Sequence, residues 1–283
     1  MTMSNSNADT FVPERGVALD AALARTTHLG IGAHQDDLEF GALHGIFECF
    51  GRSDRWFTGV TCTDGGGSPR AGVYADYTDN AMKAVRIEEQ RTAAMIGRYS
   101  AMLQMGYPSS RIKDAADSGL KDELVMLFKV ARPEIVYTHN PADKHATHVA
   151  VFRAVLHALR ELPAAERPQA VYGMEIWRGL DWMPDHKKVV LGLDGHDSLM
   201  ASLQAVFDSQ IAGGKRYDLA AAGRYRANST FFDSHGVDTD ASCLYAMDLM
   251  PLVNDAALEV GDYVIGLMQE TEQAIREQIT AVW

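Results

Sequence analysis

The 283-residue chain is 47% hydrophobic and 23% charged, which is ordinary for a globular protein and long enough to bury the core of one large domain. Its formal net charge of -12 argues against nucleic acid or an anionic membrane as a partner, because binding either one requires a concentrated basic surface. The three cysteines are widely separated and the N-terminus lacks the basic and apolar segments of a signal peptide, so we expect a cytoplasmic protein without a disulfide framework.

Strand and helix patterns alternate through the first half of the chain. Residues 1–25 read as a polar tail that becomes an amphipathic lead-in. Strands are predicted at 27–33, 56–63, 101–107 and 134–138, and helices at 37–50, 80–96, 121–131 and from 145 to about 163. Such alternation implies parallel crossovers, so we predict an α/β fold with a Rossmann-like, doubly wound, mostly parallel sheet and helices on both faces.

The alternation weakens after residue 170. Strands are expected at 170–177 and 188–193, and helices at 198–210 and 260–282. We therefore expect a single domain over residues 1–283. Its metal-binding α/β core spans residues 26–165, and a C-terminal elaboration, residues 166–283, contributes to the substrate pocket.

A charged cluster stands at the corner between the first strand and the first helix. His34, Asp36 and Asp37 follow the apolar run directly. Helix capping would explain one aspartate, since Asp is a preferred N-cap residue, but it does not explain two aspartates beside a histidine. Adjacent carboxylates repel each other, and a bound cation relieves this repulsion by taking a carboxylate and a neutral imidazole as ligands.

A second cluster follows the strand at 134–138. His145 and His148 are three residues apart and share one face at the start of a helix, whereas His139 is interpreted as a structural residue. Two imidazoles and one carboxylate are typical of catalytic zinc sites that keep a position open for water. The same set also suits non-haem iron(II), so the residues alone leave the metal open.

These segments resemble the LmbE-like, or PIG-L, family of zinc-dependent deacetylases. The family motif Ala-His-Pro-Asp-Asp-x-Glu is similar to residues 33–39, and its motif His-Pro-Asp-His is similar to residues 145–148. Weaker similarities cover Thr63-Asp64-Gly65, Arg86-Ile87-Glu88-Glu89-Gln90, Met105-Gly106-Tyr107-Pro108 and Asp208-Ser209-Gln210. The resemblance spans roughly residues 27–210.

The resemblance implies a role for each matching residue. It makes His34, Asp37 and His148 the ligands of one Zn²⁺ per chain, Asp36 the general base and His145 the group that stabilises the transition state. The implied activity is hydrolysis of an N-acyl amide, above all N-acetyl, of an amino sugar or related small molecule. Two of the departures from the motifs concern the proposed catalytic groups. Gln35 replaces a proline, and Thr147 replaces an aspartate that could orient and charge His145, a role that Asp143 could take instead.

Candidate substrate contacts come from loops and aromatic segments. They are Asp64, Arg70, Tyr74, Trp177 and Arg178. Three alternatives remain open: an amidase for a larger N-acyl or thiol-conjugate amide, a non-catalytic metal-binding protein, and a nucleotide-binding module. The last is disfavoured because the negative cluster at 34–37 stands where a pyrophosphate would bind. The expected partner is a small molecule, and a homo-oligomer is compatible with the sequence.

Overall fold

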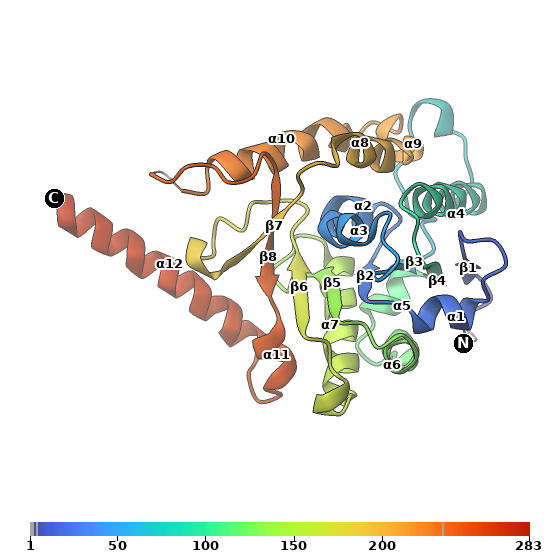
Figure 1. Ribbon diagram of the computed structural model, residues 1–283, viewed down its shortest axis with the longest axis horizontal. Coiled ribbons are helices and arrows are strands. Elements are labelled where there is room, and N and C mark those ends of the chain that lie inside the picture. Colours follow the sequence, from blue (N-terminus) through green and yellow to red (C-terminus); the bar gives the residue numbers. More distant parts are fainter. Residues whose placement is uncertain (1–2, 4, 234) are drawn as a thin grey trace.

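Apolar strands form an eight-stranded sheet in the computed structural model, which describes residues 3, 5–233 and 235–283 (Figure 1). The strands are β1 (Asp9–Phe11), β2 (His28–Gly32), β3 (Phe57–Thr63), β4 (Ala101–Tyr107), β5 (Ile135–His139), β6 (Ala170–Met174), β7 (Lys188–Gly192) and β8 (Cys243–Asp248). Their order across the sheet is β1-β4-β3-β2-β5-β6-β8-β7. Strands β2 to β6 are parallel, β1 pairs antiparallel with β4, and β8 pairs antiparallel with β6 and β7.

Helices cover both faces of this sheet (Figure 1). One layer comprises α1 (Leu19–Ala24), α5 (Ser109–Lys113), α6 (Gly119–Ala131), α7 (Ala146–Glu161) and α11 (Met250–Asn254). The other comprises α2 (Asp37–Gly41), α3 (Leu43–Cys49), α4 (Asp79–Ile96), α8 (Asp197–Ala205), α9 (Asp208–Ile211) and α10 (Tyr217–Thr230). The predicted doubly wound, mostly parallel α/β sheet is therefore confirmed.

The last helix, α12 (Val260–Val282), starts against the sheet layer and then extends away from it (Figure 1). Leu267 is buried, whereas residues 272–283 are all exposed. None of the helices in the described part of the chain combines the length and apolar character needed to cross a bilayer.

Alternating strand side chains supply the core on each face of the sheet. In β4, Leu103 and Met105 pack with the α6 and α7 layer, while Met102 packs with the α3 and α8 layer. Successive residues of a strand point to opposite faces, so a strand buried on both sides is almost continuously apolar.

Glycines in β2 let the next helix approach the sheet. A Cβ on Gly32 would lie 2.8 Å from Cβ of Asp37, and a Cβ on Gly30 would lie 2.6 Å from the ring of Phe57. Distances this short are not tolerated between carbon atoms, so these glycines are required for packing. They bring the start of α2, and with it Asp37, close to the sheet edge.

Several predicted elements differ from the structure. The helix expected at 37–50 is divided into α2 and α3 at Ala42, whose φ of -111° and ψ of 19° are not helical. The helix expected at 198–210 is likewise divided into α8 and α9. The strands β1 and β8 and the helices α5, α10 and α11 were not predicted from the sequence. Residues 1, 2 and 4 of the expected polar tail lie outside the described residues.

Candidate active site and metal centre

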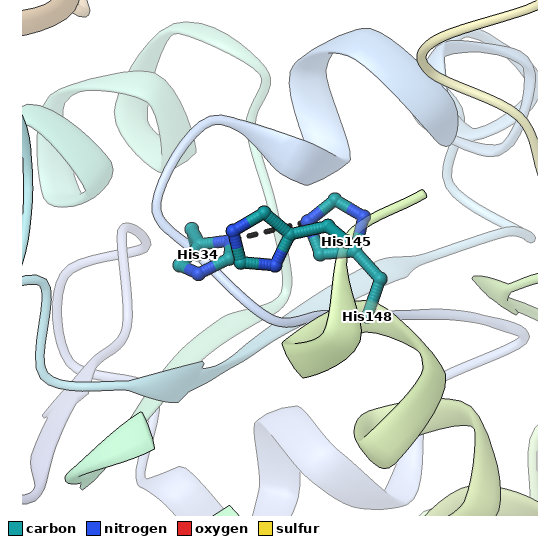
Figure 2. Close-up of side chains that lie close together, drawn as sticks. All are labelled: His34, His145 and His148. Carbon is teal, nitrogen blue, oxygen red and sulfur yellow. Dashed lines mark hydrogen bonds between the residues drawn. The ribbon is translucent and has the colours of Figure 1, made fainter. Parts of the chain in front are cut away.

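Two neighbouring strands bring the charged clusters together. β2 and β5 are parallel and adjacent, with His28 opposite Ile135 in register. The chain therefore leaves both strands at the same edge of the sheet, where ligands bind in open α/β folds. His34 follows β2, whereas His145 and His148 lie at the start of α7, and Figure 2 shows the three rings close together. Adjacent strands thus unite residues that are more than a hundred positions apart.

The donor atoms of His34, Asp37 and His148 have the spacing of a metal site. His34 Nδ1 lies 3.2 Å from His148 Nε2 and 3.4 Å from Asp37 Oδ2. The second oxygen of Asp37, Oδ1, lies 3.5 Å from His148 Nε2. Two ligand atoms at about 2.0 Å from a tetrahedral zinc ion are about 3.3 Å apart. These three groups could therefore hold one four-coordinate ion with a position left open.

Two overlapping groups of possible metal ligands lie at this site. Ring nitrogens of His34, His145 and His148 lie within 4.8 Å of one another, and so do the donor atoms of Asp37, His139 and His148. Both groups found among the described residues therefore share one ligand, His148.

A buried carboxylate orients His148. Asp143 Oδ2 accepts a hydrogen bond of 3.0 Å from His148 Nδ1, which turns Nε2 toward His34. A carboxylate behind a ligating imidazole fixes its tautomer and raises its basicity. Burial by itself lowers the pKa of His148, but the carboxylates of Asp37 and Asp143 raise it overall. The carboxylates around His148 therefore stabilise a positive charge at this position, and the same carboxylates would stabilise a bound metal cation.

His139 has a part that sequence analysis did not foresee. It is fully buried and stacks on His148 with ring centroids 3.8 Å apart. Its Nε2 lies 3.1 Å from Asp37 Oδ2 and accepts a 2.9 Å hydrogen bond from the Ala33 backbone. Burial lowers the pKa of His139 to about 4, with a further contribution from His148. Its interpretation as a structural residue was therefore incomplete, because its ring packs against two proposed ligands.

Asp36 occupies a strained position beside the donors. Its φ of 103° lies in a region that residues other than glycine rarely adopt, and its side chain caps no helix. The backbone N–H donates to Gln90 Oε1 at 3.2 Å. Burial raises the pKa of Asp36 to about 6, Arg86 lowers it, and Asp37 raises it further. Strained backbone is common at functional sites, where surrounding contacts maintain it.

Arg86 of α4 binds the segment that carries Gln35 and Asp36. Its guanidinium lies 3.1 Å from Asp36 Oδ2 and 3.0 Å from Glu89 Oε2, and it also donates to the Gln35 carbonyl. Glu89 in turn accepts hydrogen bonds from the Ser209 backbone N–H and hydroxyl, each at 2.7 Å. The network connects Asp36 to the segment that begins α9.

His145 stands at the N-terminus of α7 with its ring facing the cavity. Its Nδ1 accepts a 3.3 Å hydrogen bond from the Thr147 N–H, so a neutral ring carries its proton on Nε2. Burial lowers the pKa of His145, and the neighbouring His148 and His34 add to this effect. The side chain of Asp143 contacts the His145 backbone N–H, at 2.7 Å, and the ring of His148. The carboxylate suggested as a partner for the His145 ring is therefore engaged elsewhere.

A cavity of about 730 Å³ opens over these residues. The predicted core contributes His34, Asp36, Asp37, His145 and His148, and the C-terminal part contributes an aromatic wall around Trp177, Tyr217 and Tyr225. A volume of this size falls within the usual range for small-molecule sites. Of the five predicted substrate contacts, Trp177 lines the cavity, and its ring stacks toward His148 at 6.3 Å.

The other four predicted contacts lie outside the cavity lining. Asp64 pairs with Lys83, Arg70 donates to Asp79 and the Gly66 carbonyl, and Tyr74 donates to Asp208. Arg178 is exposed, and its backbone N–H donates to Glu175. Loop 64–79 therefore uses these side chains mainly for contacts within the protein.

A segment in the N-terminal part of the chain matches a known protein family. Residues 29–159 match the PIG-L family, described as GlcNAc-PI de-N-acetylase. This match covers both proposed ligand clusters and confirms the resemblance, together with the enzyme class that it implies, an N-deacetylase. No curated protein sequence matches the chain significantly.

Several solved structures share the fold. The conserved protein TT1542 from Thermus thermophilus has a TM-score of 0.60 at 16% identity, over 83% of this chain and 99% of its own. GalB, the 4-carboxy-2-hydroxymuconate hydratase from Pseudomonas putida, has a TM-score of 0.61 at 17% identity, over 79% and 96%. The N,N'-diacetylchitobiose deacetylase from Pyrococcus horikoshii has a TM-score of 0.56 at 16% identity, over 78% and 83%. At these identities the similarity establishes the fold, and the activity must be argued from the site.

Proposed function

We propose that this protein is a zinc-dependent hydrolase that removes an acyl group, above all acetyl, from an amino sugar or related small amine, as the match of residues 29–159 to the PIG-L family supports. One observation carries the proposal. Donor atoms of His34, Asp37 and His148 lie pairwise 3.2–3.5 Å apart, through Oδ2 of Asp37 toward His34 and Oδ1 toward His148, in the lining of a cavity that also includes Asp36.

The proposed ligands suit zinc chemically. Two imidazole nitrogens and a carboxylate are a common donor set for catalytic zinc, and a metal site of this type needs support behind each ligand. Here Asp143 supports His148, and the backbone N–H of His34 donates to Asp37 at 2.7 Å. When bound, a zinc ion would polarise the amide carbonyl and lower the pKa of water at the site.

Asp36 is the proposed general base and acid. Its carboxylate lines the cavity beside the proposed ligands, and Arg86 fixes one of its oxygens. It can accept the proton of the attacking water and then transfer that proton to the departing amine. Burial raises its pKa toward neutrality, which suits a group that must gain and lose a proton.

His145 is the proposed donor to the developing negative charge on the carbonyl oxygen. Because Nδ1 accepts the Thr147 N–H, Nε2 carries the proton of the neutral ring and can donate it in a hydrogen bond. A donor of this kind typically contributes about 3 kcal/mol to transition-state stability. This role needs the correct tautomer and does not need an imidazolium.

Gln35 substitutes for the proline of the family motif by a different physical means. Its side-chain amide donates to the Thr63 carbonyl at 3.1 Å and to Gln104 at 3.2 Å, and its own carbonyl accepts from Arg86. Proline would restrict φ at this position through its ring. Here buried hydrogen bonds hold the backbone between His34 and Asp36.

The proposal is tested by measuring newly freed amines with fluorescamine after incubation of the zinc-loaded protein with N-acetyl sugars and with bulkier N-acyl amides. We expect Asp36→Asn to retain stoichiometric zinc and to lose activity by about 100-fold or more, because the amide cannot take up the proton. Asp54→Asn, an exposed aspartate paired with Arg52, serves as the matched control.

Each outcome separates the candidate functions. Hydrolysis of N-acetyl sugars supports the deacetylase, whereas hydrolysis confined to bulkier amides supports the amidase alternative. A normal rate for Asp36→Asn would remove the mechanism. Zinc binding with the whole panel left intact would favour a non-catalytic metal-binding protein.

A further inference from the structure

Positive side chains gather around a cavity in a strongly acidic protein. The net charge of the chain is -12. The cavity lining nevertheless includes five basic residues: Arg86, Lys113, Lys215, Arg216 and Arg224. Its acidic residues are Asp36, Asp37 and Glu175. This local balance is opposite in sign to that of the whole molecule.

Several of the charged groups in the lining already have partners within the protein. Arg86 pairs with Asp36 at 3.1 Å, and Arg216 pairs with Asp218 at 2.9 Å. Glu175 accepts hydrogen bonds from two backbone N–H groups, those of Trp177 and Arg178, at 2.7 and 2.8 Å.

The cations near the cavity mouth are different. Lys113, Lys215 and Arg224 have no ion pair with any residue in the described part of the chain. All three side chains belong to exposed residues, so a ligand that enters the cavity can reach them. Uncompensated charge of one sign around a cleft concentrates the electrostatic potential there.

The ammonium group of Lys215 lies near two aromatic rings. Its Nζ lies 5.7 Å from the centroid of the Trp177 ring and 5.7 Å from that of Tyr217. A second ammonium, that of Lys144, lies 6.0 Å from the Trp177 ring. Because Trp177 also stacks toward His148 at 6.3 Å, this arrangement adjoins the proposed metal centre.

The backbone around Lys215 is anchored to the core. Its N–H donates to the Gln210 carbonyl at 3.1 Å, and the adjacent Ser209 is bound by Glu89 through two hydrogen bonds. Arg86 joins Glu89 to Asp36. The backbone that carries Lys215 is therefore fixed relative to the proposed metal centre, so its side chain needs no movement of the main chain to reach a ligand in the cavity.

We propose that Lys215, with Trp177 and Tyr217, forms an anion subsite that binds a carboxylate or phosphate group on the N-acylated substrate. The inference rests on the proposed function, since it specifies the substrate class of that site. The anion accepts hydrogen bonds from the ammonium, and the indole offers a face on which a sugar or other flat part of the substrate can stack. Lys113 and Arg224 add positive potential that attracts such a substrate toward the mouth.

The test compares three N-acetylated probes with the zinc-loaded protein: N-acetylglucosamine, N-acetylglucosamine 6-phosphate and N-acetylmuramic acid, which are neutral, phosphorylated and carboxylated. We expect kcat/KM to be higher for at least one anionic probe than for the neutral one, and to fall with added salt for the anionic probe only. The anion preferred, phosphate or carboxylate, identifies the source of the charge.

Three variants locate the effect. In Lys215→Gln the ratio of anionic to neutral kcat/KM should fall about tenfold or more, mainly through KM, because a charge-assisted hydrogen bond is lost. Lys215→Arg should restore most of this ratio. Lys129→Gln is the matched control, since Lys129 is an exposed lysine of α6 outside the cavity lining. An unchanged ratio in Lys215→Gln would overturn the subsite.

Calorimetry with the product amines separates this inference from the proposed function. Glucosamine 6-phosphate and glucosamine are titrated into the same zinc-loaded proteins. Tighter binding of the phosphorylated amine, lost in Lys215→Gln, supports the subsite even if every amide remains intact and the hydrolase proposal fails. Hydrolysis of the neutral probe without any preference for the anionic probes would leave the hydrolase standing and reject the anion subsite.

Discussion

Asp143 offers the most informative perturbation of the proposed metal centre. Its side chain is inaccessible to solvent, and its two oxygens accept from His148 Nδ1 at 3.0 Å and from the His145 N–H at 2.7 Å. Asp143→Ala removes the acceptor that orients His148 Nε2. Loss of such a support behind a ligating imidazole typically costs about 10- to 100-fold in metal affinity. We therefore expect a fall of this size in zinc affinity, with the fold retained.

The assay is competition for zinc against a chromogenic chelator, with circular dichroism as the check on folding. Asp143→Asn should lose less affinity than Asp143→Ala, because its amide oxygen can still accept from His148. Asp117→Ala is the matched control, since Asp117 also accepts from a backbone N–H two residues ahead, that of Gly119 at 2.9 Å, but lies away from the centre. Equal affinities in Asp143→Ala and Asp117→Ala would refute the proposed support of His148.

Three further predictions concern stability. Arg86→Met should lower the free energy of unfolding in urea by about 3–5 kcal/mol, because Asp36 and Glu89 would stay buried without their cation; a change below about 1 kcal/mol would contradict this. Burial lowers the pKa of His28 from 6.5 to about 4, so the unfolded chain binds a proton in this window that the folded chain excludes. The free energy of unfolding should therefore fall by roughly 3 kcal/mol at most as the pH drops from 6.5 to about 4, and it should fall less in His28→Gln. Equal dependence of this free energy on pH in the two proteins would exclude His28 as the cause. Removal of residues 272–283, which are all exposed, should change the free energy of unfolding by less than about 0.5 kcal/mol, and a larger loss in thermal or urea unfolding would reveal contacts made by this segment.

The strands and helices in the first half of the chain could be predicted because the patterns that indicate them lie within short segments of sequence. Buried parallel strands are continuously apolar, and the alternation of strands with amphipathic helices determines how they connect. Since strand ends share one sheet edge, the pairing of His34 with His148 also followed from the sequence once β2 and β5 were expected to be parallel.

Contacts between distant segments were not predictable in the same way. The edge strand β1 has only three residues and pairs with β4, far along the chain. The interaction of Glu89 with Ser209 joins positions 120 residues apart, and the sequence pattern around neither residue predicts it. Two residues of the aromatic wall, Tyr217 and Tyr225, belong to α10, which has only weak amphipathic character and was not expected as a helix.

Buried polar partners were similarly hard to assign from sequence. Asp143 was considered as a substitute for the aspartate that Thr147 replaces beside His145, but its carboxylate accepts a hydrogen bond from the ring of His148. His139 was interpreted as structural because it stands alone in the sequence, yet strand pairing places it against Asp37. In both cases the deciding factor was the direction of a side chain, which spacing does not determine.

Anomalous X-ray diffraction at the zinc edge, from crystals of the protein grown with one equivalent of zinc, tests the central claim most directly. We expect one strong peak per chain at about 2.0–2.2 Å from His34 Nδ1, an Asp37 oxygen and His148 Nε2. A zinc peak elsewhere in the chain, or no peak near these three residues, would contradict it.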